Sequence, residues 1–264
     1  MDWAAAKLDY ERDGYIIPEF RLPEETLEQI KQAHTRLIER FPRFTDYCPA
    51  LLDYDLSFLD FARNPLILDM VEQIIGPDII LWNMSFFAKP ARKGRKTPWH
   101  QDGEYWAINP LATCTVWIAV DDSTVENGCL RVIPGSHKSQ RLHPHTSNLS
   151  PDLTLSEELN ASEFDESTAV DLTLEAGQLS LHDVYLFHES EPNLSEKPRR
   201  GMTMRFMPAT SLYDREKEAA TFARFNKDGP ENLSIFLMRG EDRQGSNDFS
   251  LKAGIKAPEF AGWQ

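Results

Sequence analysis

Two side chains that bind metals stand two residues apart in the segment Trp99–Gly103, namely His100 and Asp102. On an extended chain, residues i and i+2 project to the same face, so this imidazole and this carboxylate can reach a single ion. They would supply two members of a two-histidine, one-carboxylate facial triad, whose open positions suit non-haem Fe(II). A pattern as short as His-x-Asp also occurs often by chance in proteins that bind no metal. The pair therefore indicates a metal site only if a third ligand comes from elsewhere.

Two histidines are candidates for the third ligand, His188 and His182. We expect a strand over Val184–His188, which would place the imidazole of His188 at its end, where a strand closing against the first could bring it to the pair. His182 lies next to Asp183 at an expected bend, which disfavours it. Considered alone, His188 also fits a hydrogen-bonded core histidine. The spacing between His188 and Arg199 favours His188 as the ligand.

Arg199 follows His188 by eleven residues, after a stretch rich in Asn, Ser and Pro. Such a stretch predicts a turn, so we expect Arg199 to open a strand that returns beside the one ending at His188. A guanidinium binds a carboxylate through two parallel hydrogen bonds and stays charged at any working pH. That chemistry suits the distal carboxylate of 2-oxoglutarate. The alternative is a surface arginine at the start of a strand.

The elements that must position these residues begin with helices, because the first 77 residues are mainly helical in pattern. Pro23 and the two acids after it start one helix. Asn64 is typical of an N-cap, and Gly76 is expected to end the helix that follows it. A further helix is expected at Arg215–Phe225, within a charged and irregular C-terminal extension over residues 209–264.

The sequence pattern of the central part of the chain predicts short strands separated by turns. Residues 138–168 form a polar insertion with little periodicity. Helices followed by many short strands predict one α+β domain over residues 1–264, mainly β, whose core at 78–208 is a sandwich or barrel. The segments expected as strands are Asp78–Lys89, Cys114–Val120, Cys129–Ile133, Ala169–Leu174, Gln178–His182, Val184–His188 and Arg200–Met207.

Composition excludes several classes of protein. The net charge of −14 makes nucleic acid a poor partner, because a phosphate backbone attracts a basic surface. No apolar run approaches the roughly 18 residues that a membrane span needs, and the N-terminus lacks a secretory pattern, so we expect a cytoplasmic protein. The three cysteines lie far apart, which favours reduced thiols. Glycine motifs of dehydrogenases and P-loop proteins, and the nucleophile elbow of serine hydrolases, are absent.

Four separated motifs together resemble the phytanoyl-CoA dioxygenase family, over roughly residues 8–208. The resemblance implies a double-stranded β-helix (jelly-roll) core with N-terminal helices packed on one sheet. It implies Fe(II), 2-oxoglutarate and O₂ as cofactor and cosubstrates, with His100, Asp102 and His188 as iron ligands and Arg199 as the 2-oxoglutarate anchor. The motifs are Pro98–Trp106, Thr115–Ala119, Glu126–His137 and His188–Arg199.

The same resemblance implies that Trp117, Ser190 and Ser85 line the 2-oxoglutarate pocket. There are two departures from the family. Glu189 replaces the small residue that usually follows the distal histidine, and Tyr47–Asp60 contains no equivalent of an upstream lysine of the fatty-acyl member. Together with the acidic net charge, these departures speak against phytanoyl-CoA as the substrate, while leaving the chemistry in place.

The resemblance implies hydroxylation of an aliphatic C–H bond in a small organic metabolite, with 2-oxoglutarate decarboxylated to succinate and CO₂. Related halogenases have a small residue in place of Asp102, so the carboxylate favours hydroxylation, with desaturation and ring formation left open. The residues expected to face the substrate are Glu104, Tyr105, Trp106, Asn109 and Arg205.

Two other functions remain open at this stage. A metal-dependent hydrolase or isomerase on the same scaffold would keep the metal ligands but would not need Arg199. A non-catalytic binding protein would have no reason to retain three ligands and the arginine together.

Overall fold

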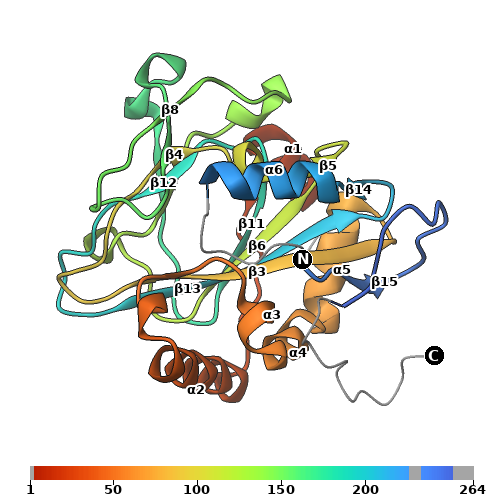
Figure 1. The fold of residues 1–264 in the computed structure, drawn as a ribbon. Coiled ribbons are helices and arrows are strands. Elements are labelled where there is room, and N and C mark those ends of the chain that lie inside the picture. The colour runs from red at the N-terminus through yellow and green to blue at the C-terminus, as the bar shows by residue number, and fades with distance from the viewer. Residues whose placement is uncertain (1–2, 226–232, 252–264) are drawn as a thin grey trace.

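The computed structural model describes residues 3–225 and 233–251. The strands form two main antiparallel sheets, and helices cover one face of the larger sheet (Figure 1). The chain is therefore mainly β with helices, as the sequence predicts. Within the described ranges, no helix is long and apolar enough to cross a bilayer. The helices are α1 (Trp3–Asp13), α2 (Glu24–Arg40), α3 (Leu51–Tyr54), α4 (Leu59–Ala62), α5 (Pro65–Ile75) and α6 (Arg215–Phe225).

The larger sheet has the strand order β1-β11-β6-β13-β3-β15, with β2 also paired to β3. Its central strands are buried along almost their whole length, because both of their faces are covered. The C-terminal strand β15 joins this sheet at β3. The strands are β1 (Tyr15–Ile16), β2 (Tyr47–Cys48), β3 (Ile79–Lys89), β6 (Cys114–Ala119), β11 (Leu179–Asp183), β13 (Arg199–Pro208) and β15 (Phe236–Arg239).

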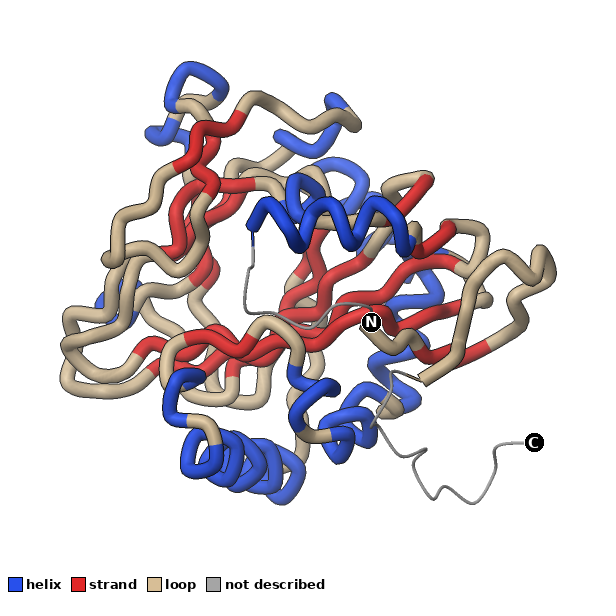
Figure 2. Tube along the Cα trace, viewed as in Figure 1, coloured by secondary structure: helices blue, strands red, loops and turns tan. Residues whose placement is uncertain are grey.

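The smaller sheet has the order β10-β7-β12-β4, and two pairs of short strands lie outside both sheets (Figure 2). One of these pairs, β8 with β9, lies in residues 138–168, which the sequence pattern predicted to be an irregular insertion. The smaller-sheet strands are β4 (Thr97–His100), β7 (Leu130–Val132), β10 (Val170–Leu172) and β12 (His188–Ser190). The remaining pairs are β5 (Ile108–Asn109) with β14 (Leu212–Tyr213), and β8 (His145–Ser147) with β9 (Glu157–Leu159).

The main core lies between the larger sheet and the helices. The apolar stripe of α2 and the buried side of α5 pack against inward residues of β3, β6 and β13. Helix α5 has both predicted end signals, because the Asn64 side chain accepts hydrogen bonds from the backbone of Leu66 and Ile67 and the helix ends at Gly76. Helix α6 lies on the opposite side of the larger sheet from α2 and α5 (Figure 1). The side chains of β13 that line the cavity described below lie on the face of the sheet that α2 and α5 do not cover.

Two predicted details of strand arrangement are wrong. Val184–Phe187 is a turn rather than a strand, so His188 begins β12 instead of ending a strand. The cause is local, because the Asp183 carboxylate and carbonyl accept hydrogen bonds from the backbone of Tyr185 and Leu186. Strand β13 does begin at Arg199, but it pairs with β3 and β6 in the larger sheet, not with β12.

Candidate metal centre and adjoining cavity

The structure brings His100, Asp102 and His188 together. His100 and His188 end β4 and begin β12, and they are paired in register. Asp102 opens the short 3₁₀ turn that follows β4. One nitrogen or oxygen from each of the three buried side chains lies within 4.8 Å of the others. Asp102 Oδ1 is 3.8 Å from His100 Nε2 and 3.9 Å from His188 Nε2, so all three side chains face one point.

Backbone carbonyls fix the orientation of both histidine rings. His100 Nδ1 is 2.8 Å from the carbonyl of Pro98, and His188 Nδ1 is 2.9 Å from the carbonyl of Leu186. A carbonyl only accepts, so each Nδ1 carries the proton and donates it. Each Nε2 is then left with a lone pair directed at Asp102, as in histidines that bind a metal. The donor set therefore fits a divalent metal ion.

His182 lies beside this group, on the other oxygen of Asp102. Its Nε2 is 3.5 Å from Asp102 Oδ2, and the Thr115 hydroxyl donates to the same oxygen at 3.3 Å. Neither ring nitrogen of His182 has a hydrogen-bond partner among the described residues. The three-residue cluster contains His188 and not His182, in agreement with the choice made from the sequence.

The charge state of Asp102 suits a ligand. Burial would raise its pKa, but the contacts with His100 and His182, and then the proximity of His188 and Arg205, outweigh burial and hold the pKa well below its usual value. The pKa of His188 is well below its usual value, chiefly because of burial and then because of His100. A carboxylate beside neutral imidazoles is the protonation state in which these groups bind a metal.

Arg199 lines the same cavity as the three ligands and is 2% exposed. Its Nε and Nη2 donate to the carbonyl of Gly128, its Nη1 to the carbonyl of Phe87, and its Nη2 to the Ser190 hydroxyl. Burial lowers the pKa of Arg199 to about 10, so the group stays charged at neutral pH. These contacts occupy all but one of its N–H groups, which leaves an Nη1 hydrogen and the hydroxyl hydrogen of Ser190 for a carboxylate.

Trp117 and Ser190, both predicted to be pocket residues, line this cavity, whereas Ser85 does not. The guanidinium of Arg199 lies 5.5 Å from the Trp117 ring. The Ser85 hydroxyl donates to the carbonyl of Pro49 at 2.9 Å and accepts from Arg205 at 2.5 Å. Ser85 therefore supports Arg205 from outside the residues that line this cavity, and its expected role in the 2-oxoglutarate pocket stays a prediction.

One face of β13 supplies a row of cavity residues that the sequence analysis used only in part. Arg199, Thr203 and Arg205 line the cavity from alternate positions, and Gly201 lies between them. A Cβ atom on Gly201 would lie 2.2 Å from the Trp117 ring, so only glycine leaves space for that indole. Period-two spacing from Arg199 was the signal that identifies Thr203.

A second, larger cavity of about 420 Å³ adjoins the first and shares Asp102, Phe87 and Arg205 with it. Three of the predicted substrate-facing residues, Tyr105, Trp106 and Arg205, line it. Glu104 and Asn109 do not. Asn109 is exposed on β5, paired with β14, and Glu104 lies 4.0 Å from His145, so both predictions of substrate contact are unsupported.

The walls of the larger cavity come mainly from residues that sequence reasoning missed. Eight of the 21 lining residues are aromatic, and the lining comes from segments far apart in the chain, including α6. No local motif connects them, so only the folded chain reveals them. They include Arg43, Phe44, Tyr47, Tyr54, Trp82, Tyr213 and Glu218.

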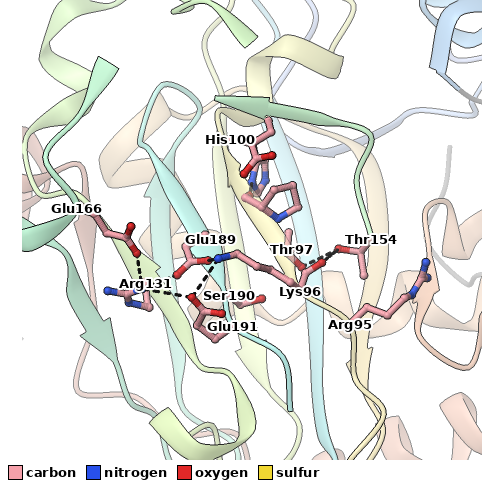
Figure 3. Close-up of polar contacts among 12 residues, drawn as sticks. Arg95, Lys96, Thr97, His100, Arg131, Thr154, Glu166, Glu189, Ser190 and Glu191 are labelled. Carbon is pink, nitrogen blue, oxygen red and sulfur yellow. Dashed lines mark hydrogen bonds and ion pairs between the residues drawn. The ribbon is translucent and has the colours of Figure 1, made fainter. Parts of the chain in front are cut away.

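The unusual Glu189 is explained by an ion-pair network on the side of β12 away from the metal centre. Its buried carboxylate lies 2.7 Å from Arg131 and 3.2 Å from Lys96, and Lys96 also pairs with Glu191 (Figure 3). Burial raises the pKa of Glu189, and the two cations oppose this. Glu166, Glu189 and Glu191 also lie close enough together to hold a cation, but Arg131 and Lys96 already neutralise them.

Lys89 was also missed, and it holds the chain around Ser190. Its buried Nζ donates to the carbonyls of Arg95, Ser190 and Glu191 at 2.5, 3.0 and 2.7 Å. Burial, followed by repulsion from Arg199, lowers the pKa of Lys89 to about 6. The residue does not line the metal cavity, so its role is to fasten the strand that carries Ser190.

Three comparisons place this geometry among known proteins. A curated relative from Dictyostelium discoideum, a phytanoyl-CoA dioxygenase domain-containing protein 1 homolog, is 31% identical over 163 residues, which are 60% of this chain and 57% of that protein. A solved non-haem monooxygenase, ThoJ, superposes with a TM-score of 0.70 at 26% identity, covering 89% of this chain and 84% of its own. EvdO2 from Micromonospora carbonacea var. aurantiaca, solved with 2-oxoglutarate, gives 0.63 at 27% identity, with coverages of 77% and 90%.

The matched region spans about half the length of the first curated relatives, from 46% to 59%. EvdO2 binds 2-oxoglutarate, which is the cosubstrate that the sequence predicts for this chain. The model of the phytanoyl-CoA dioxygenase family matches residues 10–201, well over half of the chain. This protein therefore belongs to the phytanoyl-CoA dioxygenase family.

Proposed function

We propose that this protein is an Fe(II)- and 2-oxoglutarate-dependent dioxygenase that hydroxylates an aliphatic C–H bond of a small organic metabolite. The proposal assigns His100, Asp102 and His188 as the iron ligands. The observation that carries it is the meeting of these side chains with a buried arginine, Arg199, in one cavity. We further infer that the two sheets enclosing this cavity form a double-stranded β-helix.

Each residue has a defined task in this proposal. Bound iron would supply coordination of 2-oxoglutarate and O₂ and oxidation of the substrate C–H bond, with succinate and CO₂ released. The carbonyls of Pro98 and Leu186 hold the two imidazoles in the tautomer that presents Nε2. Arg199 and the Ser190 hydroxyl receive the distal carboxylate of 2-oxoglutarate. Asp102 fills the ligand position that a halide would need, which favours hydroxylation.

The buried arginine also separates this function from its alternatives. A hydrolase or isomerase at the same metal centre would not need a charged guanidinium at the end of the cavity. Holding Arg199 at 2% exposure imposes a desolvation cost, which a dicarboxylic cosubstrate offsets. The substrate is a small molecule in this proposal, and the cytoplasmic location stays a prediction.

The test is succinate formation by the purified protein loaded with Fe(II), with and without O₂, across a panel of small metabolites. We expect O₂-dependent succinate that exceeds the uncoupled background with at least one panel member. His100→Ala and His188→Ala should each lower the rate by about 1,000-fold or more, because each removes a metal ligand. His34→Ala is the matched control, since His34 is a buried histidine on α2 at the opposite, helix-covered face of the sheet.

Two results would contradict the proposal. One is the absence of succinate in an iron-loaded protein with every panel member. The other is succinate formation that survives in His100→Ala and His188→Ala, since the product would then come from another site.

A further inference from the structure

Arg205 is a buried cation whose donors are mostly unused. It lies on the same face of β13 as Arg199, is 5% exposed, and lines both cavities. Its Nη1 donates to the Ser85 hydroxyl at 2.5 Å, and its Nε has no hydrogen-bond partner among the described residues. Burying a guanidinium with so few partners is costly unless something else binds it.

The two acids that line the cavities around this cation already have other partners. Asp102 faces the two histidines through Oδ1, while His182 and the Thr115 hydroxyl approach its Oδ2. Glu218, the other acid lining the larger cavity, accepts from the Tyr213 hydroxyl at 2.7 Å and the Leu233 backbone at 3.0 Å. No ion pair joins Arg205 to a carboxylate in the described part of the chain.

Aromatic rings surround Arg205 in place of an acid. Its guanidinium carbon lies 5.3 Å from the Trp106 ring and 5.9 Å from the rings of Trp82 and Phe87. A cation near such rings gains about 0.5–2 kcal/mol, which offsets part of the desolvation cost. The rings hold the cation in place but use none of its N–H groups, so those groups remain available to an acceptor.

Charge balance indicates the sign of the missing ligand. Asp102 carries one negative charge, and Arg199 and Arg205 carry one positive charge each. A divalent iron and a doubly charged 2-oxoglutarate would cancel each other. One positive charge is left in the loaded site, at Arg205, where an anionic group would neutralise it.

We propose that Arg205 binds the anionic group of the substrate, and that the substrate is an apolar carboxylate with a flat or ring-containing body. The proposal rests on the function proposed above and names its substrate class. The aromatic walls of the 420 Å³ cavity suit such a body. Arg43, exposed at the wall and stacked 4.8 Å from the Phe44 ring, adds a second positive charge, and neither acid of the wall is free to receive an ammonium group.

The experiment measures binding without turnover. Calorimetric titrations use protein loaded with Zn(II) in place of iron and saturated with 2-oxoglutarate. The probes are three matched pairs, namely benzoate, cinnamate and 1-naphthoate with their neutral amides. We expect at least one carboxylate to bind about 10-fold or more tightly than its amide, because a charge-assisted hydrogen bond is lost in the amide.

Variants then assign the preference to Arg205. Arg205→Met should remove the preference for the carboxylate, and Arg205→Lys should retain part of it. Arg200→Met is the matched control. Arg200 also lies on β13, but its side chain faces the opposite side of the sheet from Arg205 and pairs with Asp121 at 2.7 Å. Circular dichroism spectra of all variants check that the fold is kept.

Several outcomes would overturn the proposal. These are equal binding of carboxylates and amides, no binding of any pair, or an unchanged preference in Arg205→Met. A repeat of the titrations without 2-oxoglutarate adds one more, because a carboxylate that binds only there would assign Arg205 to the cosubstrate. The readout is independent of catalysis. A carboxylate preference in a protein that forms no succinate would uphold the anion site and reject only the proposed activity.

Discussion

The two cavities that meet at Asp102 are built in different ways. The metal cavity is small, about 30 Å³, and its lining comes almost entirely from strands of the two sheets. The neighbouring cavity is about 420 Å³, and its lining comes from loops, short helices and α6 as well as strands. Strands paired on both sides hold their side chains rigidly, whereas loops and helix faces vary more readily. In the proposed function, the sheets would thus fix the chemistry, and the segments around them would set the choice of substrate.

The two arginines of β13 repeat this contrast within one strand. Arg199 donates to three protein oxygen atoms, so its position is set before any ligand binds. Arg205 has one such partner, Ser85, and is otherwise surrounded by rings. A prepared site suits a cosubstrate that is the same in every turnover. A cation with unused donors suits the ligand that distinguishes one enzyme from another.

Among the changes that separate the two cavities, the largest effect is expected at Arg199. Arg199→Met should raise the KM for 2-oxoglutarate about 100-fold, because about 3 kcal/mol of charge-assisted hydrogen bonding is lost. Binding of a carboxylate probe in the larger cavity should change little. Initial rates of succinate formation over a range of 2-oxoglutarate concentrations measure the first, and calorimetry the second. An unchanged KM for 2-oxoglutarate would remove the functional distinction between the cavities.

A smaller effect is expected from filling the floor of the metal cavity. Gly201→Ala places a methyl group against the Trp117 ring, so it should lower the free energy of unfolding by roughly 1–3 kcal/mol. It should also weaken 2-oxoglutarate binding, because Trp117 lines that pocket. Urea denaturation measures the stability. Gly245→Ala is the comparison, since no atom lies within 4 Å of a Cβ built there, although its positive φ adds a backbone cost. Equal stability of Gly201→Ala and the parent would show that the indole moves freely.

The smallest effect is expected in the wall of the larger cavity. Trp106→Phe keeps a ring near Arg205 and should change stability by no more than about 1 kcal/mol, a typical value for one aromatic contact. The KM for 2-oxoglutarate should stay within about 2-fold, while the order of preference among panel substrates shifts. Succinate yields across the panel test this, and a KM change as large as that of Arg199→Met would contradict it.

The sequence predicted best what depends on neighbouring residues. The end signals of α5 at Asn64 and Gly76, and the placement of His100 beside Asp102, follow from local chemistry. Predictions from the sequence failed where strand pairing between distant segments determines the arrangement. The Asp183 turn moved His188 from the end of a strand to the start of one, and β13 joined the other sheet. The aromatic cavity was not predictable, because its walls meet only after folding.

Arg205 lies six positions after Arg199 on β13, and at about 3.3 Å per residue their Cα atoms lie roughly 20 Å apart. The strand therefore fixes the distance between the two arginines, and with it the distance between the two anions that the site would hold. Insertion or deletion of one residue between them would turn one arginine to the opposite face of the sheet. New substrates are consequently easier to accept by exchanging side chains at the Arg205 end than by changing the length of the segment.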